Sequence, residues 1–282
     1  MMSRVVVAAA AAVLLSTGSS FASELAGVSA ALGQGTVQSY TLLGADGAPT
    51  EIGVTLSAGA FEGLPDEPNN TSRCVDFDGN GTINASGECE GDLQLNLPFA
   101  AELAGREDIP FVFAMVNYQP HGHPPLAWAV PHFDIHFYSI TPAEVEAIRT
   151  GPCEFFIDCD VREQAIKPVP AAYVHPDHVD VGAAVGLMGN HLIDIKTPEL
   201  AKGGPPFTHT WIYGAFDGRI IFHEVMATNE FLASTPDLCA DIKQPEAWQR
   251  AGYYPTRYCF RREADGGLSI YLADFVLRPA ST

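Results

Sequence analysis

Short apolar or alternating runs of residues, separated by turn-forming residues, dominate the chain. Runs of this length are typical of β-strands rather than of helices. Two pairs of runs flank a short turn each, which predicts two β-hairpins. These are 36–43 with 51–56 around the turn at 45–47, and 207–214 with 219–226 around Asp217-Gly218.

Three further strands are predicted at 111–117, 132–138 and 268–277. The clearest helix starts at Thr141, which precedes a proline and stands three residues before a glutamate, the pattern of a capping box. We expect this helix to end near Thr150-Gly151, and a single helical turn within 57–63.

Regular helices do not alternate with the predicted strands, which disfavours a parallel α/β fold. We therefore predict a mainly β fold, an antiparallel barrel or sandwich with one or two short helices. Residues 23–282 are predicted to form one domain, with a polar insertion at 64–92 that is rich in Pro, Asn and Gly.

Residues 1–22 have the features of a secretory signal peptide. Arg4 precedes an apolar run from Val5 to Leu15, and Ser20 and Ala22 supply the small residues of a cleavage site. The run is too short to cross a bilayer, and no later stretch is long and apolar enough. We expect a periplasmic or extracellular protein that starts at Ser23 and has no membrane anchor.

Acidic residues outnumber basic ones by 34 to 15, which gives a net charge of −19, or −20 once Arg4 leaves with the signal peptide. Such a charge disfavours nucleic acid and anionic lipid as partners, whereas it tolerates cations. Solubility alone is a sufficient reason for it. The 47% apolar content is enough for a substantial core.

Six cysteines in an exported chain favour disulfides over metal thiolates. Six cysteines allow 15 pairings, and the sequence does not select one. We predict the sequence-local set because each couple brackets a loop rich in Gly, Pro or acidic residues. The predicted couples are Cys74 with Cys89, Cys153 with Cys159, and Cys239 with Cys259.

Four of the nine histidines lie within sixteen residues, in the string HGHPPLAWAVPHFDIH. Imidazole is the commonest metal-binding side chain, so this crowding predicts a metal site. A single histidine would more often be a core residue bonded to backbone carbonyls, but four together favour a metal. With no thiolate in the set, zinc is the first choice, and copper, iron and manganese are alternatives. The four are His121, His123, His132 and His136.

Strand geometry limits which of these histidines can share one ion. His132 and His136 point to the same face of a strand, but their Cα atoms would lie about 13 Å apart. Either the strand bends or bulges there, or the two histidines have different roles. His121 and His123 make an easier chelating pair. Asp134 could be a ligand, or the carboxylate that fixes a histidine tautomer, which we prefer.

More distant residues could complete the coordination. His191 follows a glycine turn, whereas His175 and His178 are expected in an exposed loop. In the second hairpin, Glu224 shares a face with apolar residues, where a carboxylate must be paired or bind metal. We therefore choose Glu224 over His223, which points the other way.

The strings PHGHPP, PHFDIHFY and MGNH, followed by an aromatic hairpin with Glu224, resemble those of a family of exported bacterial proteins of unknown function. The resemblance runs from Gly35 to about Leu232. Pro124 and Val225 depart from the family pattern, which has an acid and a proline there. The resemblance implies a β-rich fold with a metal site formed by His121, His123, His132, His136, His191 and Glu224.

A second ion site is predicted in the insertion, where residues 76–84 match the first nine positions of a calcium loop. Position 12 is Gly87 rather than glutamate, and flanking helices are not expected. The alternative is a surface turn rich in Asp, Asn and Gly. The predicted calcium ligands are Asp76, Asp78, Asn80, Thr82 and Glu88.

These patterns predict an exported metal-binding domain and leave its activity open. It could bind or sequester a transition metal, or be a metal-dependent enzyme, a hydrolase or cupin-like oxygenase, with an open coordination position. A structural metal in a homo-oligomeric scaffold is a third possibility. Motifs of serine hydrolases, phosphate-binding loops and HExxH proteases are absent from the sequence.

Overall fold

Two antiparallel sheets form the framework of the protein. The computed structural model describes residues 23–66, 74–76, 79–83, 88, 93–153, 156–234 and 237–281. In spatial order, the first sheet contains β1 (Ser23–Leu32), β2 (Gly35–Leu43), β3 (Pro49–Leu56), β15 (Leu268–Ala273), β14 (Arg257–Arg262) and β12 (Leu238–Asp241). The second contains β4 (Leu93–Pro98), β5 (Phe113–Gln119), β6 (His132–Tyr138), β11 (Arg219–Thr228), β10 (His209–Phe216), β9 (Gly189–Asp194) and β8 (His178–Val185).

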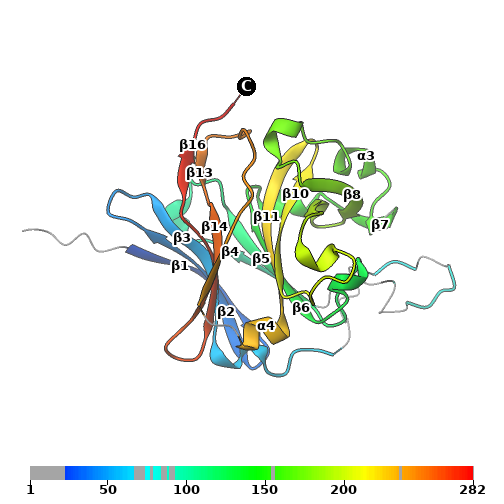
Figure 1. Cartoon of the computed structure of the whole chain (residues 1–282), viewed down its shortest axis with the longest axis horizontal. Helices are drawn as coiled ribbons and strands as arrows, with labels where there is room; N and C mark the ends of the chain where they lie inside the picture. The colour runs from blue at the N-terminus through cyan, green and yellow to red at the C-terminus, as the bar shows by residue number, and fades with distance from the viewer. Residues whose placement is uncertain are drawn as a thin grey trace, which may run out of the picture.

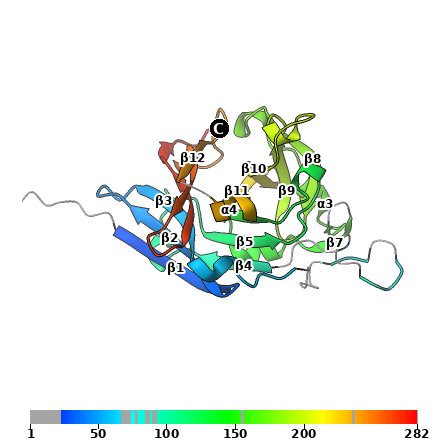
Figure 2. The ribbon, with the colours of Figure 1, turned by 60° about the horizontal axis from the view of Figure 1, so that its bottom comes forward.

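The two sheets lie against each other and are not closed into a barrel (Figures 1 and 2). The prediction of a mainly β fold is confirmed, and of its two forms the sandwich is the consistent one. Side chains from both sheets meet in one large apolar cluster, and each fully buried side chain of this kind contributes about 1.5–3 kcal/mol. Its members include Val37, Ile52, Val54 and Ile270 from the first sheet, and Val116, Ile135, Phe137 and Val225 from the second.

Strand β6 lies inside the second sheet and is buried along its whole length. It pairs with β5 on one side and with β11 on the other, in both cases without a shift of register. Phe133, Ile135 and Phe137 belong to the apolar cluster between the sheets. Because side chains alternate along a strand, His132, Asp134 and His136 point to the opposite face of the sheet.

Helices are few and short in the described part of the chain: α2 (Pro142–Glu146), α3 (Arg162–Ala165) and α4 (Asn229–Ser234). The predicted capping box is confirmed, since the Glu144 backbone N–H donates to Thr141 Oγ1 and the Thr141 N–H donates to Glu144 Oε2. The predicted helix end near 150–151 is wrong. The chain turns after Glu146 so that Ile148 is buried in a second apolar cluster, and Thr150 begins β7 (Thr150–Cys153).

The predicted hairpin around Asp217-Gly218 is confirmed, with φ angles of 50° and 72° that fit a type I′ turn. The predicted strand 268–277 is instead divided into β15 and β16 (Val276–Arg278). Asp274, with φ of 53°, turns the chain between them, and β16 pairs with β13 (Gly252–Tyr254).

Two of the predicted disulfides are present, Cys153–Cys159 and Cys239–Cys259. The latter joins directly opposite residues of β12 and β14. Cys89, the predicted partner of Cys74, lies outside the described residues, as do the predicted signal peptide 1–22 and most of the insertion 64–92.

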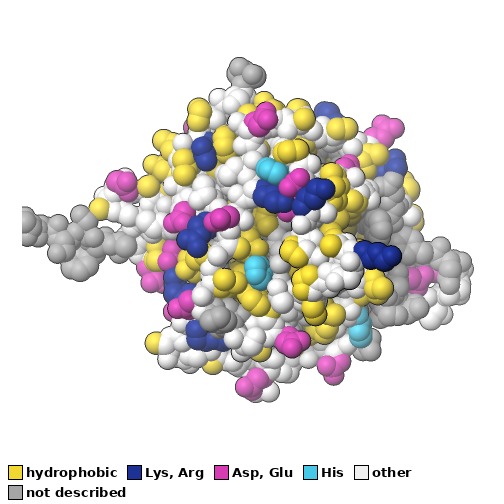
Figure 3. All heavy atoms as spheres, in the orientation of Figure 1, with side chains coloured by type: hydrophobic (Ala, Val, Ile, Leu, Met, Phe, Trp, Pro, Cys, Tyr) yellow, Lys and Arg dark blue, Asp and Glu magenta, His cyan; other side chains and the backbone are white. Residues whose placement is uncertain are grey.

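None of the helices described is long and apolar enough to cross a membrane. On the face drawn in Figure 3, acidic and basic side chains are interspersed among apolar ones and do not form a single large patch of one sign.

Candidate metal centres

Three side chains from three strands converge on the face of the second sheet that points away from the first. They are His136 of β6, Glu224 of β11 and His191 of β9. Glu224 Oε2 lies 3.6 Å from His136 Nε2 and 3.8 Å from His191 Nε2. All three atoms lie within 4.8 Å of one another, so this trio, the His136 group, could hold a metal ion.

The strand pairing explains this convergence. Glu224 is the direct neighbour of His136 across the β6–β11 ladder. On the other side of β11, Gly214 of β10 pairs with both Phe222 and His191. Since Gly214 has no side chain, the ring of Phe222 fills the space above it, where a Cβ would meet ring atoms at 2.0–2.2 Å, and this ring contacts both His136 and His191.

A second trio, the His123 group, consists of His123, His132 and Asp134. His132 Nε2 lies 3.1 Å from Asp134 Oδ1, and His123 Nε2 lies 3.8 Å from Asp134 Oδ2. The two imidazoles are nearly perpendicular, with ring centroids 4.8 Å apart. This trio could also hold a metal ion.

The two groups share strand β6 but no residue. With its register unbroken on both sides, β6 neither bulges nor brings His132 and His136 to one ion. Of the two possibilities that the sequence left open, the structure favours different roles for these histidines.

Backbone carbonyls fix the orientation of three of the histidines. The Nδ1 atoms of His123, His132 and His191 lie 2.8, 2.7 and 2.9 Å from the carbonyl oxygens of Pro124, Val130 and Ala183. In the tautomer that donates from Nδ1 to a carbonyl, Nε2 presents its lone pair to the centre of each trio. Metal-binding histidines are commonly held in this way.

Asp134 is buried between the two histidines of its group and accepts a hydrogen bond of 3.2 Å from Gln119 Nε2. Burial alone would raise the pKa of this carboxyl, but the facing His132 and His123 hold the pKa below its usual range. This balance favours the ionised carboxylate, which can face a cation. Its oxygens face both Nε2 atoms, which favours the role of a ligand over that of a carboxylate behind one histidine.

Apolar side chains surround both groups. Trp128, Phe207 and Met226 belong to one cluster, in which Trp128 contacts His123 and Phe207 contacts His132. Phe222 contacts both imidazoles of the His136 group, with ring centroids at 4.9 and 5.2 Å. Such surroundings lower the local dielectric and strengthen the interaction of charged ligands with a cation.

The remaining histidines are separate from both trios. His121 is exposed and lies outside the two groups, so its role as a ligand stays a prediction. His223 is buried on the face of β11 opposite to Glu224, as predicted from the alternation of side chains along the strand. Burial lowers the pKa of His223 to about 3.

His178 was expected in an exposed loop, but it is buried at the start of β8, where its ring contacts Tyr213. Burial lowers its pKa to about 4, although Asp194 opposes the shift. As the pH falls, His178 therefore becomes protonated near pH 6.5 in the unfolded chain but only near pH 4 in the folded protein. The free energy of unfolding should fall as the pH decreases through this window, by up to about 1.4 kcal/mol per unit.

This pH dependence can be measured by urea unfolding at pH 7, 6 and 5 on metal-stripped protein. His178→Phe should have a smaller slope than the wild type, by up to one proton. Equal slopes would show that His178 does not contribute.

The predicted calcium loop is described only in part, because Asp78 lies outside the described residues. Asp76 accepts hydrogen bonds from the backbone N–H groups of Asn80 and Gly81, and Asn80 Oδ1 accepts one from the N–H of Thr82. Gly81 has a φ of 79°, the turn conformation expected of the glycine in a calcium loop. Glu88 is buried.

Comparisons with models of protein families, with curated proteins and with solved structures gave no match. The function must therefore be argued from the donor atoms themselves. Each trio offers two imidazoles and one carboxylate, the donor set of several catalytic zinc sites and of non-haem iron sites.

Proposed function

We propose that this protein binds two transition-metal ions, one at the His136 group and one at the His123 group. The observation that carries the proposal is the convergence of His136, His191 and Glu224 from three strands on a space that one ion would fill. Burying two imidazoles and a carboxylate against aromatic rings costs free energy, and a bound cation offsets this cost.

The distances between donors support a metal. Two ligands on a tetrahedral zinc ion, each about 2.0–2.1 Å from it, lie about 3.3 Å apart. The Glu224 oxygen is 3.6 and 3.8 Å from the two imidazole nitrogens, within a few tenths of an ångström of that separation, and the two nitrogens lie within 4.8 Å of each other. The hydrogen bond between His191 Nδ1 and the carbonyl oxygen of Ala183 supports the tautomer that leaves Nε2 free to bind zinc.

Zinc is the favoured metal because both groups combine imidazole with carboxylate and contain no thiolate. Iron is the principal alternative, since two histidines and one carboxylate also form the facial triad of non-haem iron proteins.

We further propose that the protein acts in an oxidising compartment outside the cytoplasm, as a metal-binding or metal-sequestering domain. The signal-peptide pattern of residues 1–22 and the two disulfides support this location. The resemblance to a family of exported proteins is part of the same proposal.

Metal-dependent catalysis is the second candidate function. Among the described residues, each trio supplies three donors, which would leave a coordination position for water or substrate. The His123 side chain is 22% exposed, so this group is more accessible than the His136 group. A bound metal there could activate water for hydrolysis or, if it is iron, bind oxygen.

Calcium is proposed for the loop at 76–84, with a structural role. The turn at Gly81 and the hydrogen bonds of Asp76 and Asn80 support it. Adding Ca²⁺ to protein treated with EGTA should raise the thermal midpoint, and a midpoint indifferent to both would contradict a calcium site.

The metal proposal is tested by elemental analysis of protein purified without a histidine tag. The wild type should contain two equivalents of transition metal. His136→Ala and His132→Ala should each retain one, whereas the control His175→Ala, altered outside both trios, should retain two. Equal metal content in all four proteins would refute the assignment.

A further inference from the structure

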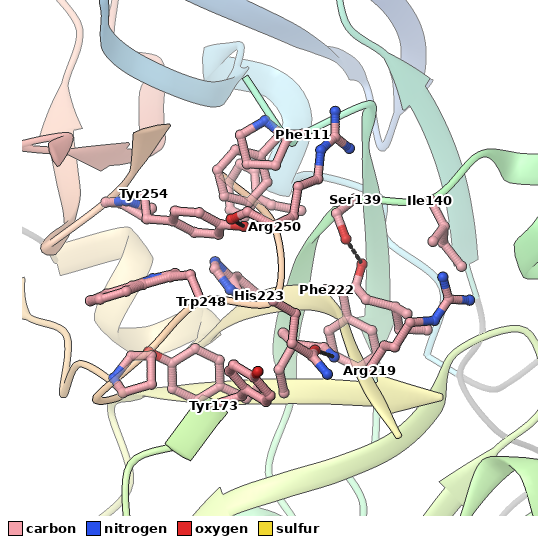
Figure 4. Close-up of a pocket in the computed structure, with 18 of the residues that line it drawn as sticks. Phe111, Ser139, Ile140, Tyr173, Arg219, Phe222, His223, Trp248, Arg250 and Tyr254 are labelled. Atoms are coloured by element: carbon pink, nitrogen blue, oxygen red, sulfur yellow. Dashed lines mark hydrogen bonds between the residues drawn. The ribbon is translucent and has the colours of Figure 1, made fainter. Parts of the chain in front are cut away.

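A cavity of about 240 Å³ lies beside the start of β11, on the side of the strand opposite to Glu224. Segment 244–255 covers it, and residues of β6, β10 and β11 form its floor. Figure 4 shows His223 in its interior, with Arg219 and Arg250 on two sides. None of the six residues of the metal trios lines this cavity.

Aromatic side chains contribute a large part of the wall, seven of its 20 residues. Figure 4 shows Tyr254, Trp248 and Tyr173 along the left side of the space and Phe111 above it. Trp248 and Tyr254 contact each other, with ring centroids 6.1 Å apart, and Tyr254 also contacts His223. Walls of this kind favour a flat, apolar ligand, which can stack on the rings or meet their edges.

The charge of the lining is the reverse of the charge of the protein. Arg219 and Arg250 line the cavity and no carboxylate does, although the chain has a net charge of −19. Within the described part of the chain, neither guanidinium lies within ion-pair distance of a carboxylate, although Arg219 is near enough to Glu144 and Asp217 to lower the pKa of both, and Arg250 donates to the backbone carbonyl of Glu107. Guanidinium groups bind carboxylates through paired hydrogen bonds, so an anionic ligand is favoured.

His223 provides an independent sign of a ligand. Its exposed fraction is 7%, and its ring lies 5.3 Å from Phe111 and 5.1 Å from Tyr213, measured between centroids. Among the described residues, its Nδ1 has no hydrogen-bond partner. Buried polar groups are nearly always hydrogen-bonded, so a buried imidazole lining a cavity favours a ligand with a polar group.

We propose that this cavity is a binding site for a small aromatic carboxylate. The ring of the ligand lies against Trp248 and its aromatic neighbours, and the carboxylate points toward one of the two arginines. His223 forms a hydrogen bond with a polar group of the ligand. Pockets for drug-sized ligands measure roughly 300–1,000 Å³, so a cavity of about 240 Å³ suits a compound of one ring, or of two fused rings.

The test uses benzoate, 4-hydroxybenzoate and indole-3-carboxylate, with binding followed by calorimetry and, for the two benzoates, by the tryptophan fluorescence that is lost in Trp248→Ala. At least one should bind saturably with a dissociation constant below about 1 mM. The corresponding neutral amide should bind at least about ten-fold more weakly, because it loses the charged hydrogen bonds to arginine. Absence of saturable binding for all three acids, or equal affinity for acid and amide, would overturn the proposal.

Variants locate the site. Trp248→Ala should weaken the acid and the amide alike, whereas Arg219→Gln or Arg250→Gln should weaken the acid alone by about ten-fold. The matched control is Arg257→Gln on β14, which does not line the cavity. Both arginines are exposed, so these variants should fold. If the affinity for the acid were unchanged in both arginine variants, the ligand would bind elsewhere. His136→Ala is a second control, and it should bind the acid with the affinity of the wild type.

Discussion

Removal of transition metal with 1,10-phenanthroline is expected to lower the thermal midpoint of this protein by about 10 °C for each ion removed. An ion that binds only the folded state, at a free concentration 1,000 times its dissociation constant, adds about 4.1 kcal/mol to the free energy of unfolding. For a domain of this size, 1 kcal/mol corresponds to about 2–4 °C. The measurement is a thermal scan by circular dichroism with and without the chelator.

The variant His136→Ala provides the comparison for this experiment. Because this variant lacks the ion at the His136 group, its thermal midpoint should be lower than that of the wild type. Addition of the chelator should then lower the midpoint of the variant by less. Wild type and variant should converge in the chelator, apart from the packing lost with the imidazole. A wild-type midpoint indifferent to the chelator would mean that no ion stabilises the fold.

Glu224→Gln is expected to weaken metal binding at the His136 group by more than about 100-fold. Glutamine keeps the size of the side chain but removes the charge that faces His136 and His191 at 3.6 and 3.8 Å. Loss of a residue that only orients a metal ligand already lowers metal affinity by about 10–100-fold, so loss of a ligand should lower the affinity further. Competition with a chromogenic chelator measures the affinity.

The second equivalent of metal should remain in Glu224→Gln, because the His123 group shares no residue with the His136 group. Glu246→Gln is the matched control, since Glu246 is exposed and belongs to neither trio. Loss of both equivalents in Glu224→Gln, or loss of neither, would contradict two separate centres.

The local pattern of the chain was enough to predict β6 with both of its ends. The alternation of apolar and polar residues from His132 to Tyr138 identifies a strand, and a strand places every second side chain on one face. Its rise per residue also implies that His132 and His136 are too far apart to share an ion without a bend. The unbroken register of β6 fits that reasoning.

The partners within each trio were not predictable from the same information. His136 meets His191 and Glu224 through the pairing of β6, β11, β10 and β9, and such pairing depends on long-range contacts. His123 meets His132 because the loop between β5 and β6 folds back over the sheet, where Trp128 is buried. The alternation of residues along a strand gives no information about how such a loop folds. The sequence therefore favours His121, only two residues away, as the partner of His123.

Several strands of the sandwich were missed for a related reason. Strand β1 has the sequence SELAGVSAAL, in which small residues replace the apolar ones that mark a strand, and it is mostly exposed. It forms the edge of the first sheet and is stabilised by pairing with β2. Strands β12 and β13 are four and three residues long, too short for a periodic pattern to be recognised.

The alternation of side chains along β11 also directs two neighbouring polar residues to opposite faces of the sheet. Glu224 points to a trio of metal donors, whereas His223 points to the aromatic cavity. Glu224 as a ligand stays a prediction, which its place in the trio supports. Burial of a carboxylate on an apolar face was the signal that separated Glu224 from His223.

The most direct test of two separate metal centres is an anomalous difference map from crystals of the tag-free protein, recorded on both sides of the absorption edge of the bound metal. Two peaks are expected, one about 2.0–2.2 Å from the donor atoms of His136, His191 and Glu224, and one at the same distance from those of His123, His132 and Asp134. A map without peaks at these positions, or with one peak shared by His132 and His136, would contradict the assignment.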